Sequence, residues 1–286
     1  MYCKLINRIK HHIMYKRFEY RNNNLLFVVR VGRTANKKIA PNTKTPIIQT
    51  YTLAKEQFEC IVNGGTWKDL IKFDAANCGD CPYSGNQGHK AGKCYTHKFI
   101  QLKSLETMLK SIARKYGDNF DAIEFIPEQP SQEIIGYAEK MFVRFGTYGE
   151  PAFWPKQWIE KMAVGSYTGY THQWAKEQYQ FLSNYLMASC HSELERKVAN
   201  SMGWLAFVAM TENNVKAVHC PASEEMGFKS NCSACSLCSG TKGKGKKDVK
   251  IFVHLLVIQG CLYHVYGLSK VKIFIRTLMH LRLPSA

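Results

Sequence analysis

The 286-residue chain lacks three features that would place it in a familiar class of protein. No repeat of fixed period is visible, so a repeat architecture is not expected. No sustained apolar stretch follows the first methionine, because Lys4, Arg8 and Lys10 interrupt it, and a secretory signal peptide is therefore not expected. Residues 255–286 are interrupted by polar and basic side chains, which makes them a poor membrane span. Together these absences favour a cytoplasmic protein without a membrane partner.

Acidic residues are scarce at both ends of the chain, and this scarcity accounts for the net charge of +17. Residues 1–45 contain eleven Lys or Arg against one acidic residue, and residues 239–286 contain nine against one. The body of the chain, 46–238, is nearly neutral, with 19 basic and 20 acidic residues. Binding of nucleic acid is therefore an expectation for the basic ends alone, which are equally typical of solvated tails. Nothing in the sequence indicates the oligomeric state.

Cysteine, by contrast, is abundant, with eleven residues in the chain. A chain of this length can fold without disulfides, and in a reducing compartment a Cys-x2-Cys pattern indicates metal binding or redox chemistry. Seven cysteines form two groups. The first cysteine group is Cys78-x2-Cys81-x12-Cys94, and the second cysteine group is Cys220-x11-Cys232-x2-Cys235-x2-Cys238.

The spacing of the second cysteine group is the more specific of the two. Three cysteines at successive x2 spacings suit one corner of a cuboidal iron–sulfur cluster, and Cys220, followed by Pro221, is the natural fourth ligand. Structural zinc sites usually take two Cys-x2-Cys pairs from separate segments. A [4Fe–4S] cluster is therefore the expected occupant of these four cysteines, with zinc as the alternative.

The first cysteine group has no evident fourth cysteine. Three thiolate ligands leave one coordination position open, which is what a catalytic metal centre needs. Alternatively, His89 or His97 completes a structural Cys3His zinc site.

Apolar periodicity predicts an alternation of strands and helices. Residues 24–33 predict a strand and residues 99–116 the clearest helix. Further strands are expected over 70–74, 122–126, 141–145, 164–170, 185–189, 205–210, 215–219 and 249–254, and further helices over 51–62, 131–138, 155–162, 179–182 and 193–202. This order favours an α/β fold with a complete or partial (β/α) barrel, and a doubly wound open sheet is the alternative. In both folds, side chains at the carboxyl ends of the strands converge on one site.

The segment 142–151 ends an apolar strand in the turn Gly149-Glu150-Pro151, which presents one carboxylate. An early strand, a cysteine group whose last member precedes Tyr95, and this turn together resemble the radical S-adenosylmethionine (SAM) superfamily. The superfamily's usual spacing is Cys-x3-Cys-x2-Cys, whereas the first cysteine group has x2 and then x12. The second cysteine group is similar to the auxiliary iron–sulfur domains of many members. Residues 66–254 also resemble uncharacterised cysteine-rich bacteriophage proteins with a Cys-Pro…Cys-x2-Cys-x2-Cys ending, which would place the protein in the host cytoplasm.

The resemblance implies a role for each of these residues. Cys78, Cys81 and Cys94 would ligate three irons of a [4Fe–4S] cluster and act as the catalytic centre, while the fourth iron binds the amino and carboxylate groups of SAM. Glu150, within the turn from Gly149 to Pro151, would neutralise that amino group. Members of the superfamily cleave SAM reductively to a 5′-deoxyadenosyl radical, which abstracts a hydrogen atom from the substrate.

We therefore divide the chain into a basic extension (1–45), an α/β domain like that of the superfamily (46–219), a cysteine-rich metal-binding segment with a final strand (220–254) and a basic, apolar extension (255–286). The expected function is that of an iron–sulfur protein with one or two [4Fe–4S] clusters, acting as a radical-SAM-like enzyme on a substrate that the residues do not identify. The alternative is a zinc-stabilised protein without catalysis that binds nucleic acid.

Overall fold

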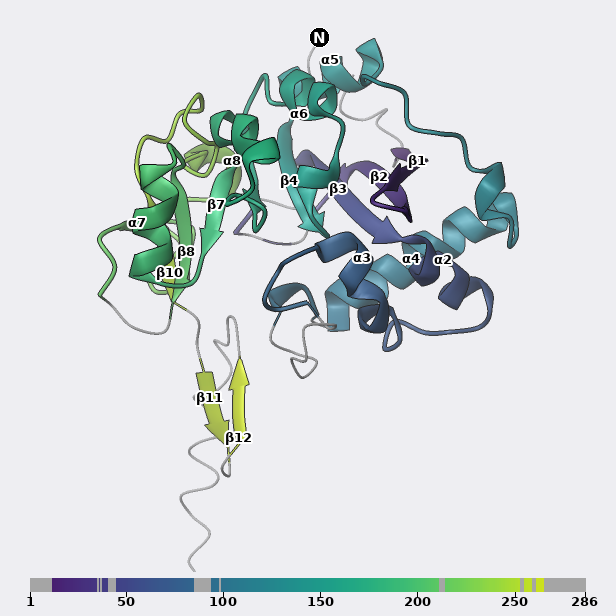
Figure 1. Ribbon diagram of the computed structural model, residues 1–286, viewed down its shortest axis with the longest axis horizontal. Helices are drawn as coiled ribbons and strands as arrows, with labels where there is room; N and C mark the ends of the chain where they lie inside the picture. The colour runs from purple at the N-terminus through teal and green to yellow at the C-terminus, as the bar shows by residue number, and fades with distance from the viewer. Residues whose placement is uncertain are drawn as a thin grey trace, which may run out of the picture.

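A computed structural model describes residues 12–34, 36, 38–40, 45–84, 94–97, 99–210, 214–252, 255–258 and 261–264. The fold is mixed α/β, as expected, with two five-stranded sheets of which one is entirely parallel (Figure 1). None of the helices in those ranges has the length and apolarity needed to cross a membrane.

The first sheet has the strand order β1-β2-β3-β4-β5. The neighbours β1, β2 and β3 run antiparallel, whereas β3, β4 and β5 run parallel. Arg21 and Asn22, with φ angles of 49° and 63°, form the two-residue turn between β1 and β2, because a tight hairpin turn requires positive φ at both positions. The strands are β1 (His12–Tyr20), β2 (Asn23–Arg33), β3 (Pro46–Ala54), β4 (Phe142–Tyr148) and β5 (Tyr167–Thr168).

Helices cover both faces of the first sheet, and Figure 1 shows α2 and α4 on one side and α5 and α6 on the other. Along β2, Phe27 packs into the core that contains Trp158 of α6, while Leu26 and Val28 pack into the core that contains Leu109 of α4. This double burial explains why β2 reads as a continuous apolar run. The helices are α2 (Lys55–Val62), α4 (Phe99–Tyr116), α5 (Gln132–Lys140) and α6 (Lys156–Met162).

The second sheet has the order β6-β7-β8-β10-β9, and all its described strands are parallel. Helix α7 (Glu193–Ser201) connects β7 to β8. Only Gly169 separates β5 from β6, and a Cβ atom there would lie 2.8 Å from Phe145 Cβ and 2.5 Å from Leu186 Cδ2, so glycine suits the crowded point where the chain passes from one sheet to the other. The strands are β6 (Tyr170–Thr171), β7 (Met187–Cys190), β8 (Ala206–Met210), β9 (Val218–His219) and β10 (Val249–Phe252), with a separate hairpin of β11 (Leu255–Ile258) and β12 (Cys261–His264).

Some expected boundaries differ from those observed. The strand expected over 70–74 is wrong, since Leu70–Phe73 form a 3-10 helix and Asp74–Cys78 form α3. The start of the helix expected over 51–62 belongs to β3. Only Phe125 of the strand expected over 122–126 makes a β-bridge, with Arg17. The expected extension 1–45 contains β1 and β2, which belong to the first sheet. The strand expected over 164–170 is divided into β5 and β6, which lie in different sheets, and the helix expected over 179–182 is part of a 3-10 helix, Glu177–Asn184. The remaining expected elements of the described residues are present with shifted ends.

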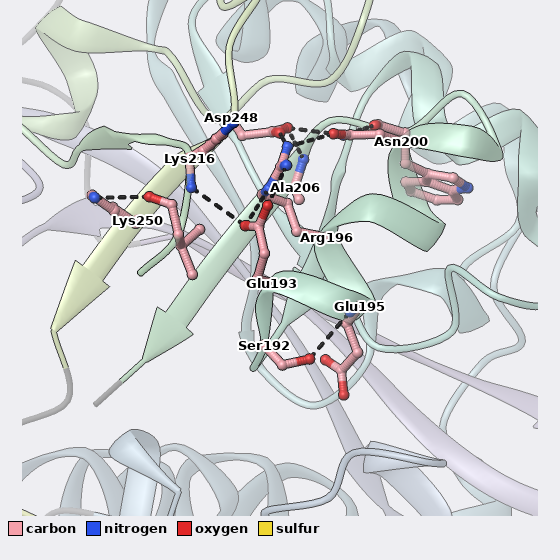
Figure 2. Close-up of polar contacts among 11 residues, drawn as sticks. Ser192, Glu193, Glu195, Arg196, Asn200, Ala206, Lys216, Asp248 and Lys250 are labelled. Carbon is pink, nitrogen blue, oxygen red and sulfur yellow. Dashed lines mark hydrogen bonds and ion pairs between the residues drawn. The ribbon is translucent and has the colours of Figure 1, made fainter. Parts of the chain in front are cut away.

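A polar network fixes α7 to the amino ends of β8 and β10. Figure 2 shows Arg196 between the carboxylates of Glu193 and Asp248, at 2.7 and 2.6 Å. Asp248 also accepts hydrogen bonds from Asn200 Nδ2 at 3.1 Å and from the backbone N–H of Ala206 at 2.7 Å. One carboxylate therefore joins a helix to the first residue of a strand.

Replacing Asp248 by alanine is expected to lower the free energy of unfolding by about 2–4 kcal/mol, because Asn200 Nδ2 and the backbone N–H of Ala206 lose their charged acceptor, while Arg196 keeps its ion pair with Glu193. Glu124→Ala provides the control, since Glu124 is 72 % exposed in its ion pair with Lys16 and its loss is expected to cost at most about 1 kcal/mol. Urea unfolding of both variants makes the comparison. Equal losses would show that the Asp248 network does not secure α7.

Candidate functional site

A cavity of about 400 Å³ is lined by one face of the parallel strands. Strand β4 contributes Arg144, Gly146 and Tyr148, strand β7 contributes Ser189, and strand β8 contributes Phe207. These are alternate residues, as expected for side chains that share one face of a strand. The intervening side chains pack into the core on the opposite face. The cavity therefore follows directly from the strand periodicity.

All three residues of the first cysteine group line this cavity. Cys78 is the last residue of α3, and the backbone N–H of Cys81 donates to Cys78 O at 3.3 Å, so the x2 spacing is folded as a tight turn. Gly79 allows this turn, because its φ is 56° and a Cβ atom would lie 2.7 Å from Phe153 Cζ. All three cysteines that the sequence groups therefore lie on the wall of the same cavity.

Burial makes the thiols of the first cysteine group poor acids. Burial holds the pKa of Cys78 well above its usual value, and the negative charges of Asp74 and Cys81 add to this effect. Burial likewise raises the pKa of Cys81 to about 12. The thiol of Cys94 lies 2.9 Å from Thr96 Oγ1, and burial raises its pKa as well. A bound cation would offset this cost by stabilising the thiolates.

Among the described residues there is no group of three or more His, Cys, Asp or Glu side chains already arranged to hold a metal ion. The first cysteine group nevertheless provides three thiols that line one cavity. Such a set suits a metal centre with one position open to that cavity.

The turn Gly149-Glu150-Pro151 lies beside the first cysteine group and contributes to the same cavity. Gly149 has a φ of 74°, and a Cβ atom there would lie 2.2 Å from Thr52 O, so only glycine fits. The buried carboxylate of Glu150 accepts from the backbone N–H groups of Ala152 and His172, each at 3.1 Å. Burial nevertheless raises the pKa of Glu150 to about 7.

This raised pKa predicts a pH-dependent stability for the metal-free protein. The folded state holds the Glu150 proton more tightly than the unfolded state, whose pKa is near 4.5, so stability is lost as the pH rises through 7. The difference in unfolding free energy between Glu150→Gln and the wild type should therefore shift by about 3 kcal/mol in favour of the variant between pH 4.5 and pH 8. Parallel stability curves would show that Glu150 has an ordinary pKa.

Two histidines at the cavity were not among the sequence-predicted site residues. His172 follows β6 and His191 follows β7, and their Nε2 atoms lie 3.2 Å apart with the rings stacked. His172 Nε2 also lies 3.8 Å from Cys81 Sγ. Burial lowers the pKa of both, that of His172 to about 3, so both are neutral at pH 7. The available sequence signal was their position directly after adjacent parallel strands.

Of the two histidines expected as alternative zinc ligands, His89 and His97, only His97 lies among the described residues. His97 Nε2 lies 2.6 Å from Asp74 Oδ2, which leaves only its buried Nδ1 without a partner. His89 lies outside the described residues.

Cys190, which precedes His191, is fully buried in the core on the opposite face of β7, so the two do not form a catalytic pair.

The second cysteine group is also gathered in space. Burial raises the pKa of Cys238. A hydrogen bond from Tyr170 acts against this rise, and the nearby thiols of the other three cysteines of the group add to it. Helix α8 (Cys232–Cys235) is capped by Asn231 and closed by Ser236 with a φ of 48°. Cys220 and Cys238 share a small core with Val249, and Cys232 lines the cavity described above. Both cysteine groups therefore contribute to one cavity.

Comparison with known proteins identifies no relative: no family model, no curated protein and no solved structure matches the chain.

Proposed function

We propose that the protein is an iron–sulfur enzyme resembling the radical SAM superfamily, with a [4Fe–4S] cluster on the first cysteine group and a second metal centre on Cys220, Cys232, Cys235 and Cys238. One observation carries the proposal: the first cysteine group, Gly149 and Glu150 of the turn, and Cys232 all line a single cavity, whereas Pro151 is buried at the start of the following 3-10 helix. A shared cavity is what a reaction between a cofactor and a substrate requires.

The connectivity supports this proposal. The first cysteine group follows β3, helix α4 comes next, and the glycine-glutamate turn ends β4, which lies parallel to β3. Side chains that follow neighbouring parallel strands meet at the same edge of the sheet. We infer that the parallel strands of the two sheets, continuous except at Gly169, correspond to a partial (β/α) barrel.

Each residue of the site would have a separate task. Three thiolates would hold three irons and leave the fourth iron facing the cavity. A cluster with bound SAM would supply the electron transfer and radical chemistry. The Glu150 carboxylate, held by two backbone N–H groups, would stay in place to face the amino group of SAM, and a nearby ammonium would lower its pKa again.

Anaerobic purification followed by metal analysis tests the proposal. A brown protein with about four to eight irons and matching sulfide per chain is expected. A colourless protein with stoichiometric zinc would overturn it and would favour the zinc-stabilised alternative.

A further inference from the structure

We infer that the end of the cavity next to Cys232 is a binding site for an acidic substrate, in which Lys38 and Arg144 hold a carboxylate or phosphate group. Both side chains line the cavity, and they come from segments far apart in the sequence. The assignment of this ligand as the substrate rests on the proposed function, whereas the binding of an anion does not.

The position of Lys38 is fixed by the second cysteine group. The backbone N–H of Cys232 donates to Lys38 O at 2.8 Å, and that of Ser233 donates to Ile39 O at 3.0 Å. The short segment 38–40 is therefore held against the first turn of α8, and Ile39 itself is buried. These bonds hold the Lys38 backbone beside Cys232, and its side chain lines the cavity from there.

Arg144 reaches the same region from the middle of β4. It faces the cavity because it alternates with the buried Val143 and Phe145. Phe142, the preceding residue on the same face of β4, packs with Ile39 and Cys232 in one small core, so Arg144 lies next to the segment that carries Lys38. Two cations near one point in a partly closed cavity favour an anionic ligand, and a guanidinium can bind a carboxylate or phosphate through two hydrogen bonds.

The neighbouring wall is aromatic. The rings of Tyr170 and Phe207 have centroids 4.3 Å apart, and both line the cavity together with Phe252. This surface suits an apolar or aromatic group attached to the anion. Glu224 and Glu225, from the loop between Cys220 and Cys232, also line the cavity and would repel a second negative group.

Calorimetric titration of the metal-loaded protein with benzoate, phenyl phosphate and the neutral benzamide tests this inference. At least one of the two anions is expected to bind at least about tenfold more tightly than benzamide, and the stronger of the two identifies the acidic group as carboxylate or phosphate. Arg144→Gln and Lys38→Gln should each weaken binding of that anion by about 10- to 100-fold and leave benzamide binding unchanged.

Lys242→Gln is the matched control, because Lys242 does not line the cavity and should not affect binding. Glu224→Gln should leave anion binding intact or strengthen it. The inference is overturned if neither anion binds better than benzamide, or if both cation variants bind it as the wild type does. The titration gives the same result whether iron or zinc is bound. A failure of anion binding can therefore be distinguished from a failure of the proposed function, which the metal analysis tests.

Discussion

Replacing Cys81 by serine is expected to abolish cleavage of SAM while the protein remains folded. Three thiolates are the fewest that hold a cuboidal cluster with one open iron, so the loss of one removes the centre. Iron analysis should show the content of the second cysteine group alone. Reductive cleavage, followed as 5′-deoxyadenosine released in the presence of a strong reductant, should fall below detection.

Cys60→Ser is the matched control for this variant. Cys60 is also a free cysteine, partly buried where Cys81 is buried, but it belongs to neither group. Its replacement should leave the iron content and SAM cleavage unchanged. If Cys81→Ser retained wild-type iron content, the first cysteine group would not be a cluster site.

Replacing Cys238 by serine is expected to have the opposite profile, with a large loss of stability. Metal binding at a structural cysteine site contributes about 10–16 kcal/mol to folding, and loss of one ligand removes a substantial part of it. The segment of the second cysteine group also joins distant elements, since Cys238 O accepts from Gly169 N at 3.2 Å and from Thr168 Oγ1 at 3.0 Å. A loss of about 5 kcal/mol would lower the melting temperature by roughly 10–20 °C.

Thermal unfolding together with metal analysis checks this second prediction. Part of the total iron should remain in Cys238→Ser, namely the iron bound by the first cysteine group, because its ligands are unchanged. Cys60→Ser again provides the control, in which no change is expected. An unchanged melting temperature and full metal content in Cys238→Ser would contradict a metal centre on the second cysteine group.

Much of the fold could be predicted from the sequence because local pattern and tertiary packing agree there. Helix α4 has apolar residues that repeat with the helical period, and strand β2 is a continuous apolar run rich in β-branched residues; both are found as expected. The proximity of Cys78 to Cys81 and of Cys232 to Cys235 was also predictable, because an x2 spacing brings two side chains together within one turn of chain. Among the described residues, these are the places where a short segment determines its own geometry.

The remainder depends on contacts between segments far apart in the sequence. Residues 70–74 have the composition of a short strand, but Asp74 accepts hydrogen bonds from Gln57 and Tyr148, and these partners favour the helical turn that ends at Cys78. The stacking of His172 on His191 likewise arises only when β6 and β7 pair. Lys38 belongs to a segment expected to be an extension, and its place at the cavity depends on the Cys232 backbone.

The central claim is that the first cysteine group holds a cluster whose open iron binds SAM inside the cavity. Electron paramagnetic resonance of the dithionite-reduced protein, recorded with and without SAM, tests it most directly. The account predicts a [4Fe–4S]⁺ signal that changes shape when SAM is added, and this SAM-responsive signal should be absent from Cys81→Ser, in which only a signal from the second cysteine group can remain. An iron-containing protein whose spectrum is identical with and without SAM, or whose SAM-responsive signal survives in Cys81→Ser, would contradict the claim.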